Sequence, residues 1–188
     1  MKQAREQWFD QFVDTPADRL VFIDEFGAST NMQRTHGRAA SGARVVSKVP
    51  HGHWKVISTI AAMTTRGMVA AASFDGATDA VIFQTFVRES LVPMLAAGQV
   101  VIMDNLSAHK SPVVRELIES VGATALYLPP YSPDYNPIEL AISKIKTVLR
   151  SLARRAVQEL MEGIDAALKS ITPSDAMGFI RYRKYTLQ

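Results

Sequence analysis

The segment Leu128-Pro-Pro-Tyr-Ser-Pro-Asp-Tyr-Asn-Pro-Ile-Glu139 connects two elements of regular structure. The apolar run Ala123–Leu128, which leads into it, predicts a short buried β-strand. Asn136 and Pro137 predict the start of a helix that continues past position 150, because Asn is favoured at an N-cap and Pro at the first helical position. Glu139 is therefore expected in the first turn of a helix that follows a strand.

Further strands and helices alternate along the chain before this segment. Leu20–Ile23 and Val100–Met103 are compact apolar runs of strand length. Val56–Met63 and Met68–Phe74 are separated by a short turn and predict an antiparallel hairpin. Two helices are expected after the hairpin, beginning near positions 79 and 112. This order predicts an α/β fold in which a mixed five-stranded sheet is flanked by helices.

Length and composition suit one folded domain. The chain has 188 residues, of which 47% are hydrophobic and 21% charged. Residues 1–19 are predicted to form a leader helix or linker remnant, with Trp8, Phe9 and Phe12 on one side. Residues 20–188 are predicted to form the domain itself.

Composition also excludes several kinds of site and location. The absence of cysteine excludes disulfides, zinc ribbons and thiol nucleophiles. The most apolar stretch, Val56–Met63, is too short to span a bilayer, and the amino terminus has no apolar run of signal-peptide type. We therefore expect a cytoplasmic protein with no membrane partner.

Basic residues are concentrated in two stretches that lack Asp and Glu, although the net charge is only +3. The first, Phe26–Phe74, includes the irregular stretch Gly27–His53, which predicts a long loop. The second, Leu140–Gln158, falls largely in the predicted third helix. Such stretches suit a polyanionic partner, since Lys and Arg displace counterions from phosphates. Charge alone leaves two solvated surfaces as an equal alternative.

Three carboxylates lie just after predicted strands. Asp24 ends the first strand, Asp104 ends the strand Val100–Met103, and Glu139 follows the last strand. Side chains at strand ends in an open sheet converge on one crevice, where three acids repel one another unless cations lie between them. Hard oxygen ligands select Mg²⁺ or Mn²⁺, and two such ions about 3.5–4 Å apart can promote phosphoryl transfer.

Each acid taken singly also has a structural interpretation. Asp24 and Asp104 belong to a residue type that is common in turns. Glu139 lies three residues after Asn136, where an acid completes a capping box at the start of a helix. Glu25 points to the opposite face of its strand from Asp24 and is a weaker candidate. The residue types alone leave both interpretations open.

Three blocks around the acids resemble mariner-like DDE transposases, in particular their bacterial insertion-sequence branch. The blocks are Phe22-Ile-Asp-Glu-Phe26, Val101-Ile-Met-Asp-Asn-Leu-Ser-Ala-His-Lys110 and the segment that ends at Glu139. Thirty-four residues separate Asp104 from Glu139, which is the spacing of that branch. The resemblance covers residues 20 to 185, nearly the whole chain.

The resemblance implies a ribonuclease H-like DDE catalytic domain over residues 20–188. It implies that Asp24, Asp104 and Glu139 are the catalytic, metal-binding triad. It also implies hydrolysis of DNA at transposon ends, followed by attack of the freed 3′-hydroxyl on target DNA, often at a TA step. The expected cofactor is Mg²⁺ or Mn²⁺, bound as two ions.

Residues beside the triad acquire expected roles from the same resemblance. Asn105, His109 and Lys110 match the second block and are expected to line the site. His109 is expected to contact phosphate or a carboxylate, with an ordinary structural role as an equal alternative. Tyr131 and Tyr135 are expected to pack the loop that aims the third acid.

Basic residues in the two acid-free stretches are candidate contacts to DNA phosphates, which position a duplex without reading its sequence. Relatives carry an insertion between their first two strands, used for contacts with a partner subunit or DNA, where this chain has its long loop. The candidates are Arg34, Arg38, Arg44, Lys48 and His51 in the loop and Lys144, Lys146 and Arg150 in the third helix. The implied partners are transposon ends and target, both double-stranded DNA, bound by a homodimer at the bacterial nucleoid.

Departures from the relatives leave other functions open. Leu140-Ala-Ile142 stands where relatives have a polar residue first and an aromatic residue third, and residues 181–185 are unusually basic. Relatives also carry an amino-terminal helix-turn-helix region, so a separate helix-turn-helix protein or a further N-terminal region is expected to recognise the ends. The alternatives are an inactive DNA-binding or assembly protein and a ribonuclease H-like nuclease acting on RNA–DNA hybrids. The third block favours the transposase.

Overall fold

The computed structural model describes residues 5, 7–8, 15–46, 48 and 50–185. Five strands form one mixed sheet: β1 (Leu20–Ser29), β2 (Val56–Thr64), β3 (Gly67–Asp75), β4 (Val100–Met103) and β5 (Thr124–Tyr127). Their order across the sheet is β3-β2-β1-β4-β5. β1, β2 and β3 are antiparallel neighbours, whereas β1, β4 and β5 run parallel.

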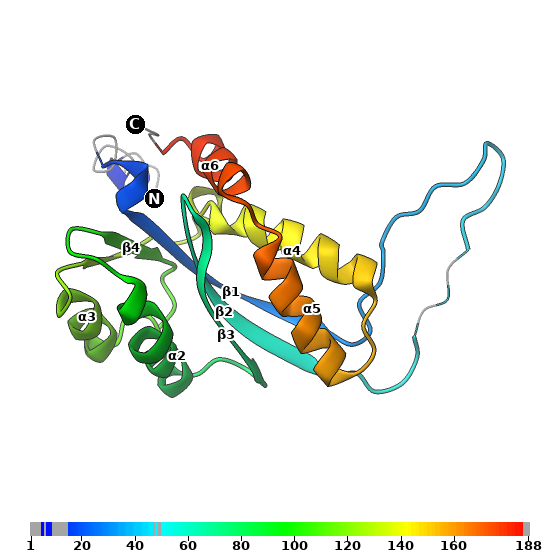
Figure 1. Ribbon diagram of the computed structural model, residues 1–188, viewed down its shortest axis with the longest axis horizontal. Helices are drawn as coiled ribbons and strands as arrows, with labels where there is room; N and C mark the ends of the chain where they lie inside the picture. The colour runs from blue at the N-terminus through cyan, green and yellow to red at the C-terminus, as the bar shows by residue number, and fades with distance from the viewer. Residues whose placement is uncertain (1–4, 6, 9–14, 47, 49, 186–188) are drawn as a thin grey trace.

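Helices cover both faces of this sheet (Figure 1). One face, called the α3 face, is covered by α2 (Ala80–Phe86), the π-helical turn η2 (Val87–Leu91) and α3 (Pro112–Glu119). The other, called the α4 face, is covered by α4 (Ile138–Leu152), α5 (Val157–Lys169) and α6 (Pro173–Tyr182). Short 3₁₀ turns are η1 (Ala17–Arg19), η3 (Val92–Met94) and η4 (Pro133–Tyr135).

β1 lies at the centre of the sheet and is buried on both faces. Leu20 and Phe22 belong to the core on the α4 face, Val21 and Ile23 to the core on the α3 face, and all four are at most 1% exposed. A continuous apolar run is what such a strand requires. The same alternation carries Asp24 to the α4 face.

α4 packs on the sheet through an apolar stripe. Ile138, Ile142, Ile145 and Leu149 are three or four residues apart and buried. Each such side chain contributes about 1.5–3 kcal/mol when it leaves water, before the entropy of ordering is subtracted. The helix ends at Ala153, whose left-handed φ of 50° interrupts it. The stripe fixes the rotation of α4 about its axis and hence the direction of the side chains in its first turn.

The predicted five-stranded mixed sheet and its flanking helices are confirmed, with one change at β1. The apolar run predicts a strand that ends at Ile23, whereas β1 continues to Ser29 because β2 pairs with it along this length. Asp24 therefore lies within a strand and not at its end. α5 and α6, which the apolar pattern did not predict, complete the α4 face.

A long irregular segment leaves the sheet between β1 and β2, as predicted (Figure 1). Its base is closed by a hydrogen bond from the Thr30 N–H to the Lys55 carbonyl at 3.0 Å. The Arg155 guanidinium adds hydrogen bonds to the carbonyls of Thr30 at 2.9 Å and Met32 at 2.8 Å. The α4–α5 connection therefore anchors the loop where it departs from the domain.

The predicted leader helix is described only in part. Arg5, Gln7 and Trp8 are helical, and Trp8 is buried in the core of the α4 face. Phe9 and Phe12 lie outside the described residues. Over the described part of the chain, no helix combines the length and the apolar character needed to cross a membrane.

Gly67 couples the β2–β3 turn to the connection between α5 and α6. Its φ is +103°, and a Cβ there would lie 2.7 Å from the Ile171 carbonyl oxygen. We predict that Gly67→Ala lowers the free energy of unfolding by about 1–3 kcal/mol, through left-handed strain and overpacking, as measured by urea denaturation. Gly178→Ala in α6 is the matched control, since no heavy atom lies within 4 Å of its added Cβ. It is expected to stabilise by about 0.5–1 kcal/mol, and equal losses at both positions would contradict the packing described.

Candidate active site

The pocket begins where β1 and β4 stop pairing. Their last paired residues are Phe22 and Ile102, after which β1 continues beside β2 and β4 ends one residue later. Asp24 and Asp104 each lie two residues beyond this last pair, so both reach the same level of the sheet. A crevice at such a split is where ligands bind in open α/β sheets.

Asn136 ties the start of α4 to this point of β1. Its Nδ2 donates to the Ile23 carbonyl at 3.2 Å and to Asp24 Oδ2 at 3.3 Å, and its side chain is 1% exposed. The expected capping role of Asn136 is therefore wrong, because α4 has Pro137 at its N-cap and no side-chain cap. No capping box involves Glu139, whose carboxylate has no hydrogen bond among the described residues. The structural interpretation of Glu139 as a capping residue is thereby removed.

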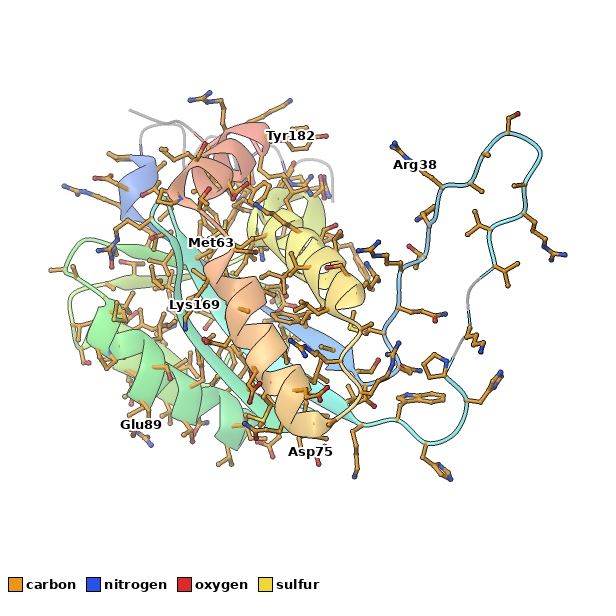
Figure 2. The ribbon with its side chains drawn as sticks, turned by 45° about the vertical axis from the view of Figure 1, so that its right-hand side comes forward. Arg38, Met63, Asp75, Glu89, Lys169 and Tyr182 are labelled. Atoms are coloured by element: carbon orange, nitrogen blue, oxygen red, sulfur yellow. The ribbon has the colours of Figure 1, made fainter. Side chains whose placement is uncertain are left out.

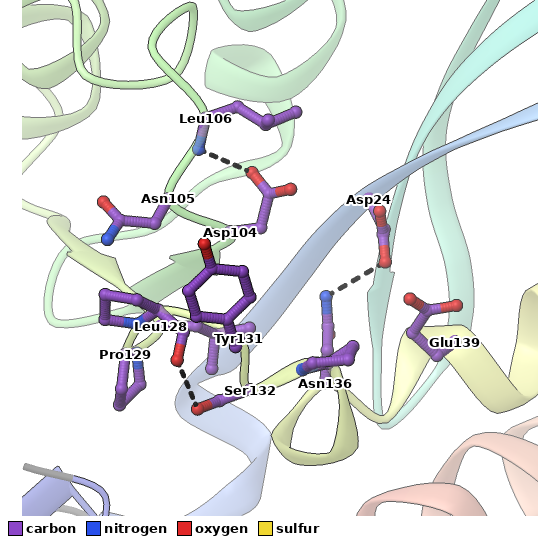
Figure 3. A pocket seen from close by; sticks show the side chains of 12 residues that line it. Asp24, Asp104, Asn105, Leu106, Leu128, Pro129, Tyr131, Ser132, Asn136 and Glu139 are labelled. Atoms are coloured by element: carbon purple, nitrogen blue, oxygen red, sulfur yellow. Dashed lines mark hydrogen bonds between the residues drawn. The ribbon is translucent and has the colours of Figure 1, made fainter. Parts of the chain in front are cut away.

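All three carboxylates line one open pocket of about 480 Å³ (Figure 3). Asp24 comes from β1, Asp104 from the residue after β4, and Glu139 from the first turn of α4. An apolar wall of the pocket is formed by the loop that precedes α4 together with the residue two after Asp104. Its members are Leu106, Leu128, Pro129, Pro130, Tyr131 and Pro133.

Negative charge at Asp24 is only partly compensated. Burial, the charge of Glu139 and the charge of Asp104 together raise the pKa of Asp24 to about 7. The backbone N–H of Glu25, which donates to Asp24 Oδ1 at 2.7 Å, acts in the opposite direction, as does the charge of His109. The charges of Glu139 and Asp104 therefore lie close enough to Asp24 to disfavour its ionisation.

His109 bridges two carboxylates from a buried position. Its Nε2 lies 3.2 Å from Glu25 Oε1, and its ring packs against Phe83 at 4.1 Å between centroids, with 1% of the residue exposed. Its Nδ1 lies 2.5 Å from Asp104 Oδ1, an ion-pair contact in which the ring N–H is not well aligned on the oxygen. Burial lowers the pKa of His109, but Asp104 and Glu25 outweigh it and raise that pKa to about 9.

The bridge keeps Asp104 charged and oriented. Burial alone raises the pKa of this carboxyl, but His109 and the backbone N–H of Leu106, which donates to Asp104 Oδ1 at 3.1 Å, bring the pKa below its ordinary value. Asp104 and Asp24 therefore differ: the first has a cationic partner in the protein, and the second faces mainly other acids.

The loop before α4 is held from outside by Arg5. The Arg5 guanidinium donates to the Tyr131 carbonyl at 3.2 Å, to Ser132 Oγ at 3.1 Å and to Asp134 Oδ2 at 2.5 Å. It also lies 4.5 Å from the centroid of the Tyr135 ring. A residue of the leader segment thus braces the wall of the pocket.

Of the three residues expected to line the site beside the acids, only Asn105 lines the pocket. His109 lies buried behind Asp104, and Lys110 is exposed and is not among the lining residues. Two residues at the site were not expected from the sequence. The sequence makes Glu25 a weak candidate because it points away from Asp24, yet it contacts His109. It predicts a helix cap at Asn136, which instead donates to Asp24.

The candidate DNA contacts separate into three groups. Arg38, with Arg44, Lys48 and His51, is exposed on the long loop, which extends away from the packed helices (Figure 2). Arg34 and Arg150 line one groove of about 380 Å³, formed by the loop and the end of α4. Lys146 is half-buried on α4, whereas Lys144 donates to Asp175 Oδ2 at 2.6 Å and already has an acidic partner.

Comparison with known proteins identifies the domain. The sheet and its flanking helices form a ribonuclease H-like fold, as the sequence predicts. Residues 19–161 match the DDE superfamily endonucleases, and the chain belongs to that family. A comparison with curated proteins found no matching sequence.

Solved structures of the Mos1 transposase resemble this fold. The paired-end complex with the left transposon end has a TM-score of 0.76 at 16% identity, over 96% of this chain and 56% of that one. The paired-end complex with Mg has a TM-score of 0.73 at 16% identity, over 96% and 57%. The catalytic domain of Mos1 mariner transposase has a TM-score of 0.67 at 15% identity, over 98% and 87%. The chain thus spans little more than half of the paired-end chains.

The donor set of the pocket fits a hard divalent cation. Carboxylate oxygens are the ligands that Mg²⁺ and Mn²⁺ prefer, and the raised pKa of Asp24 marks the place where a cation relieves repulsion. Within the described residues, no three Asp, Glu or His side chains form a ready cluster for one ion.

We predict a pH-dependent stabilisation by Asp24→Asn in metal-free protein. The folded-state pKa of about 7 lies above the ordinary 3.8, so ionisation of Asp24 destabilises the fold as pH rises through this interval. At pH 8 the variant is expected to be more stable than the wild type by on the order of 2 kcal/mol, and the difference should vanish by pH 4.

Urea denaturation at both pH values measures this difference. The exposed Glu89→Gln is the matched control and is expected to show no such dependence. A constant difference between Asp24→Asn and the wild type across this range would show that the Asp24 charge is not under repulsion.

Proposed function

We propose that this chain is the catalytic domain of a DNA transposase of the bacterial insertion-sequence branch, which cleaves DNA at transposon ends and joins it to target DNA. The observation that carries the proposal is the meeting of Asp24, Asp104 and Glu139 in one pocket that also has an apolar wall. Membership of the DDE superfamily endonucleases and the likeness to the Mos1 paired-end complexes support it. The spacing and the three sequence blocks support the choice of branch.

The three acids have distinct tasks in this proposal. Asp104, oriented by His109, offers a charged carboxylate, and Asp24, held by Asn136, offers a second one across the β1–β4 split. Glu139 has no other bonding partner in the described chain and completes the set from α4. When bound, two Mg²⁺ or Mn²⁺ ions supply activation of the attacking oxygen and stabilisation of the leaving oxygen.

The basic residues supply the contacts that hold the DNA backbone. Arg34 and Arg150 converge on one groove, which suits a phosphate of the duplex. The other proposed contacts are Arg38, Arg44, Lys48, His51 and Lys146. Lys144 is left out because Asp175 neutralises it. Joining requires two DNA ends in one complex, so the proposed active form is a homodimer on DNA.

Asp104→Asn is predicted to abolish DNA cleavage. The variant removes one charged metal ligand, and a loss of several kcal/mol of transition-state stabilisation lowers the rate at least about 100-fold. Nicking of supercoiled plasmid DNA in Mn²⁺ measures the rate without knowledge of the terminal repeats. Chelation of the metal is expected to have the same effect on the wild type.

Two comparisons make this experiment specific. Glu89→Gln, an exposed change on the α3 face, is expected to leave nicking unchanged, and the melting temperature of Asp104→Asn verifies its fold. Cleavage of an RNA–DNA hybrid without plasmid nicking would replace the proposal with a ribonuclease H-like nuclease. Calorimetry with Mn²⁺ addresses the inactive alternative, since a DNA-binding protein without catalysis has no need to bind the metal.

Arg150→Ala is predicted to weaken binding of duplex DNA equally for unrelated sequences. Loss of one phosphate contact reduces the slope of log Kd against log salt concentration by about 1, and the double variant with Arg34→Ala by about 2. Fluorescence anisotropy at several salt concentrations measures both slopes. Arg88→Ala, exposed on the α3 face, is the matched control; a slope that falls as much for this variant would show that the groove has no special role.

A further inference from the structure

Tyr131 stands at the rim of the catalytic pocket with 88% of its surface exposed (Figure 3). The expectation that it packs the loop before α4 is wrong, because the packing is made by Tyr135, which is half-buried against the core of the α4 face. Folding therefore gains little from the Tyr131 ring, and its position calls for another explanation.

The backbone holds this ring in place at a conformational cost. Tyr131 has a φ of 57°, in the left-handed region that residues with a Cβ rarely adopt. Arg5 donates to its carbonyl at 3.2 Å and to Ser132 Oγ at 3.1 Å. Ser132 is 3% exposed and donates to the Pro130 carbonyl at 3.3 Å. The loop thus holds Tyr131 in a strained backbone conformation, although its side chain is largely exposed to solvent.

The ring belongs to the apolar wall of the pocket that the three acids also line. Leu106, Leu128 and Pro129 contribute to the same wall, and Leu106 is itself 52% exposed. Metal ions and a phosphate need only the acidic side of such a pocket. An exposed aromatic ring beside apolar side chains suits a flat, apolar ligand surface, and a nucleobase next to a phosphate has this surface.

We propose that the Tyr131 ring stacks on an unpaired nucleobase adjacent to the phosphate held at the three acids. This inference rests on the proposed function, since it takes DNA as the substrate. A base inside a duplex has neighbours on both faces, and a base at a blunt end is held in its pair. The ring therefore takes an unpaired base, either in an overhang or out of the stack. The wall therefore favours DNA that is frayed or cut at the pocket over an intact blunt duplex.

The experiment compares two DNA probes of the same arbitrary sequence, with Ca²⁺ in place of Mg²⁺ to separate binding from cleavage. One is a blunt duplex, and the other carries a short 3′ overhang containing 2-aminopurine, whose fluorescence is quenched by stacking. Tyr131→Gly removes the ring and suits the left-handed φ. It is expected to raise the Kd for the overhang probe about 5- to 100-fold, to leave the Kd for the blunt duplex unchanged and to abolish the quenching.

Control variants separate stacking from other roles. Tyr131→Phe keeps the ring and is expected to match the wild type, and Tyr182→Ala, which removes another exposed tyrosine (72%), is expected to change nothing. Equal weakening of both probes by Tyr131→Gly, or no weakening of either, overturns the stacking but leaves the proposed function intact. A wild-type chain that binds neither probe overturns both. An emission shift of Tyr131→Trp with protein concentration, without DNA, would instead assign the ring to a protein interface.

Discussion

The burial of Asp24 beside the carboxylates of Glu139 and Asp104 is the constraint on which the arrangement of the site depends. Burial and then the charges of Glu139 and Asp104 disfavour the ionised form of Asp24 and raise its pKa to about 7. The fold limits the cost by placing the acids where β1 and β4 separate, so that the pocket stays open to water. A divalent cation bound in the pocket would relieve this cost.

His109 and Asn136 hold the carboxylates of Asp104 and Asp24 in position. His109 lies behind Asp104 and reaches Glu25 on the α3 face, so a buried cation connects the two faces of the sheet at the split. Asn136 acts from the other side by fastening the start of α4 to β1 beside Asp24. His109, which is not among the residues that line the pocket, and Asn136, which is, thereby orient Asp104 and Asp24.

The sequence was informative wherever local pattern decides the structure. Apolar runs of strand length predicted all five strands, and the blocks around the acids predicted the family. The three acids that these blocks single out line one pocket. It was wrong about Asn136 and Tyr131 and incomplete at Glu25. The preference of Asn for helix caps was overridden by a partner 113 residues away, and Glu25 acquired a partner 84 residues away. Lys144, expected on DNA, was neutralised by Asp175, 31 residues further along.

The sequence by itself determined the order of the elements, the burial of the apolar run that begins β1 and the presence of three acids that come after apolar runs, because each follows from residue types a few positions apart. Only the tertiary structure decided how those acids differ. Asp104 is paired with His109, whereas the charges around Asp24 are mainly those of other acids. Glu139 does not cap α4. These differences depend on the burial of each side chain and on its distance from residues remote in the chain. Spacing along the sequence gives neither quantity.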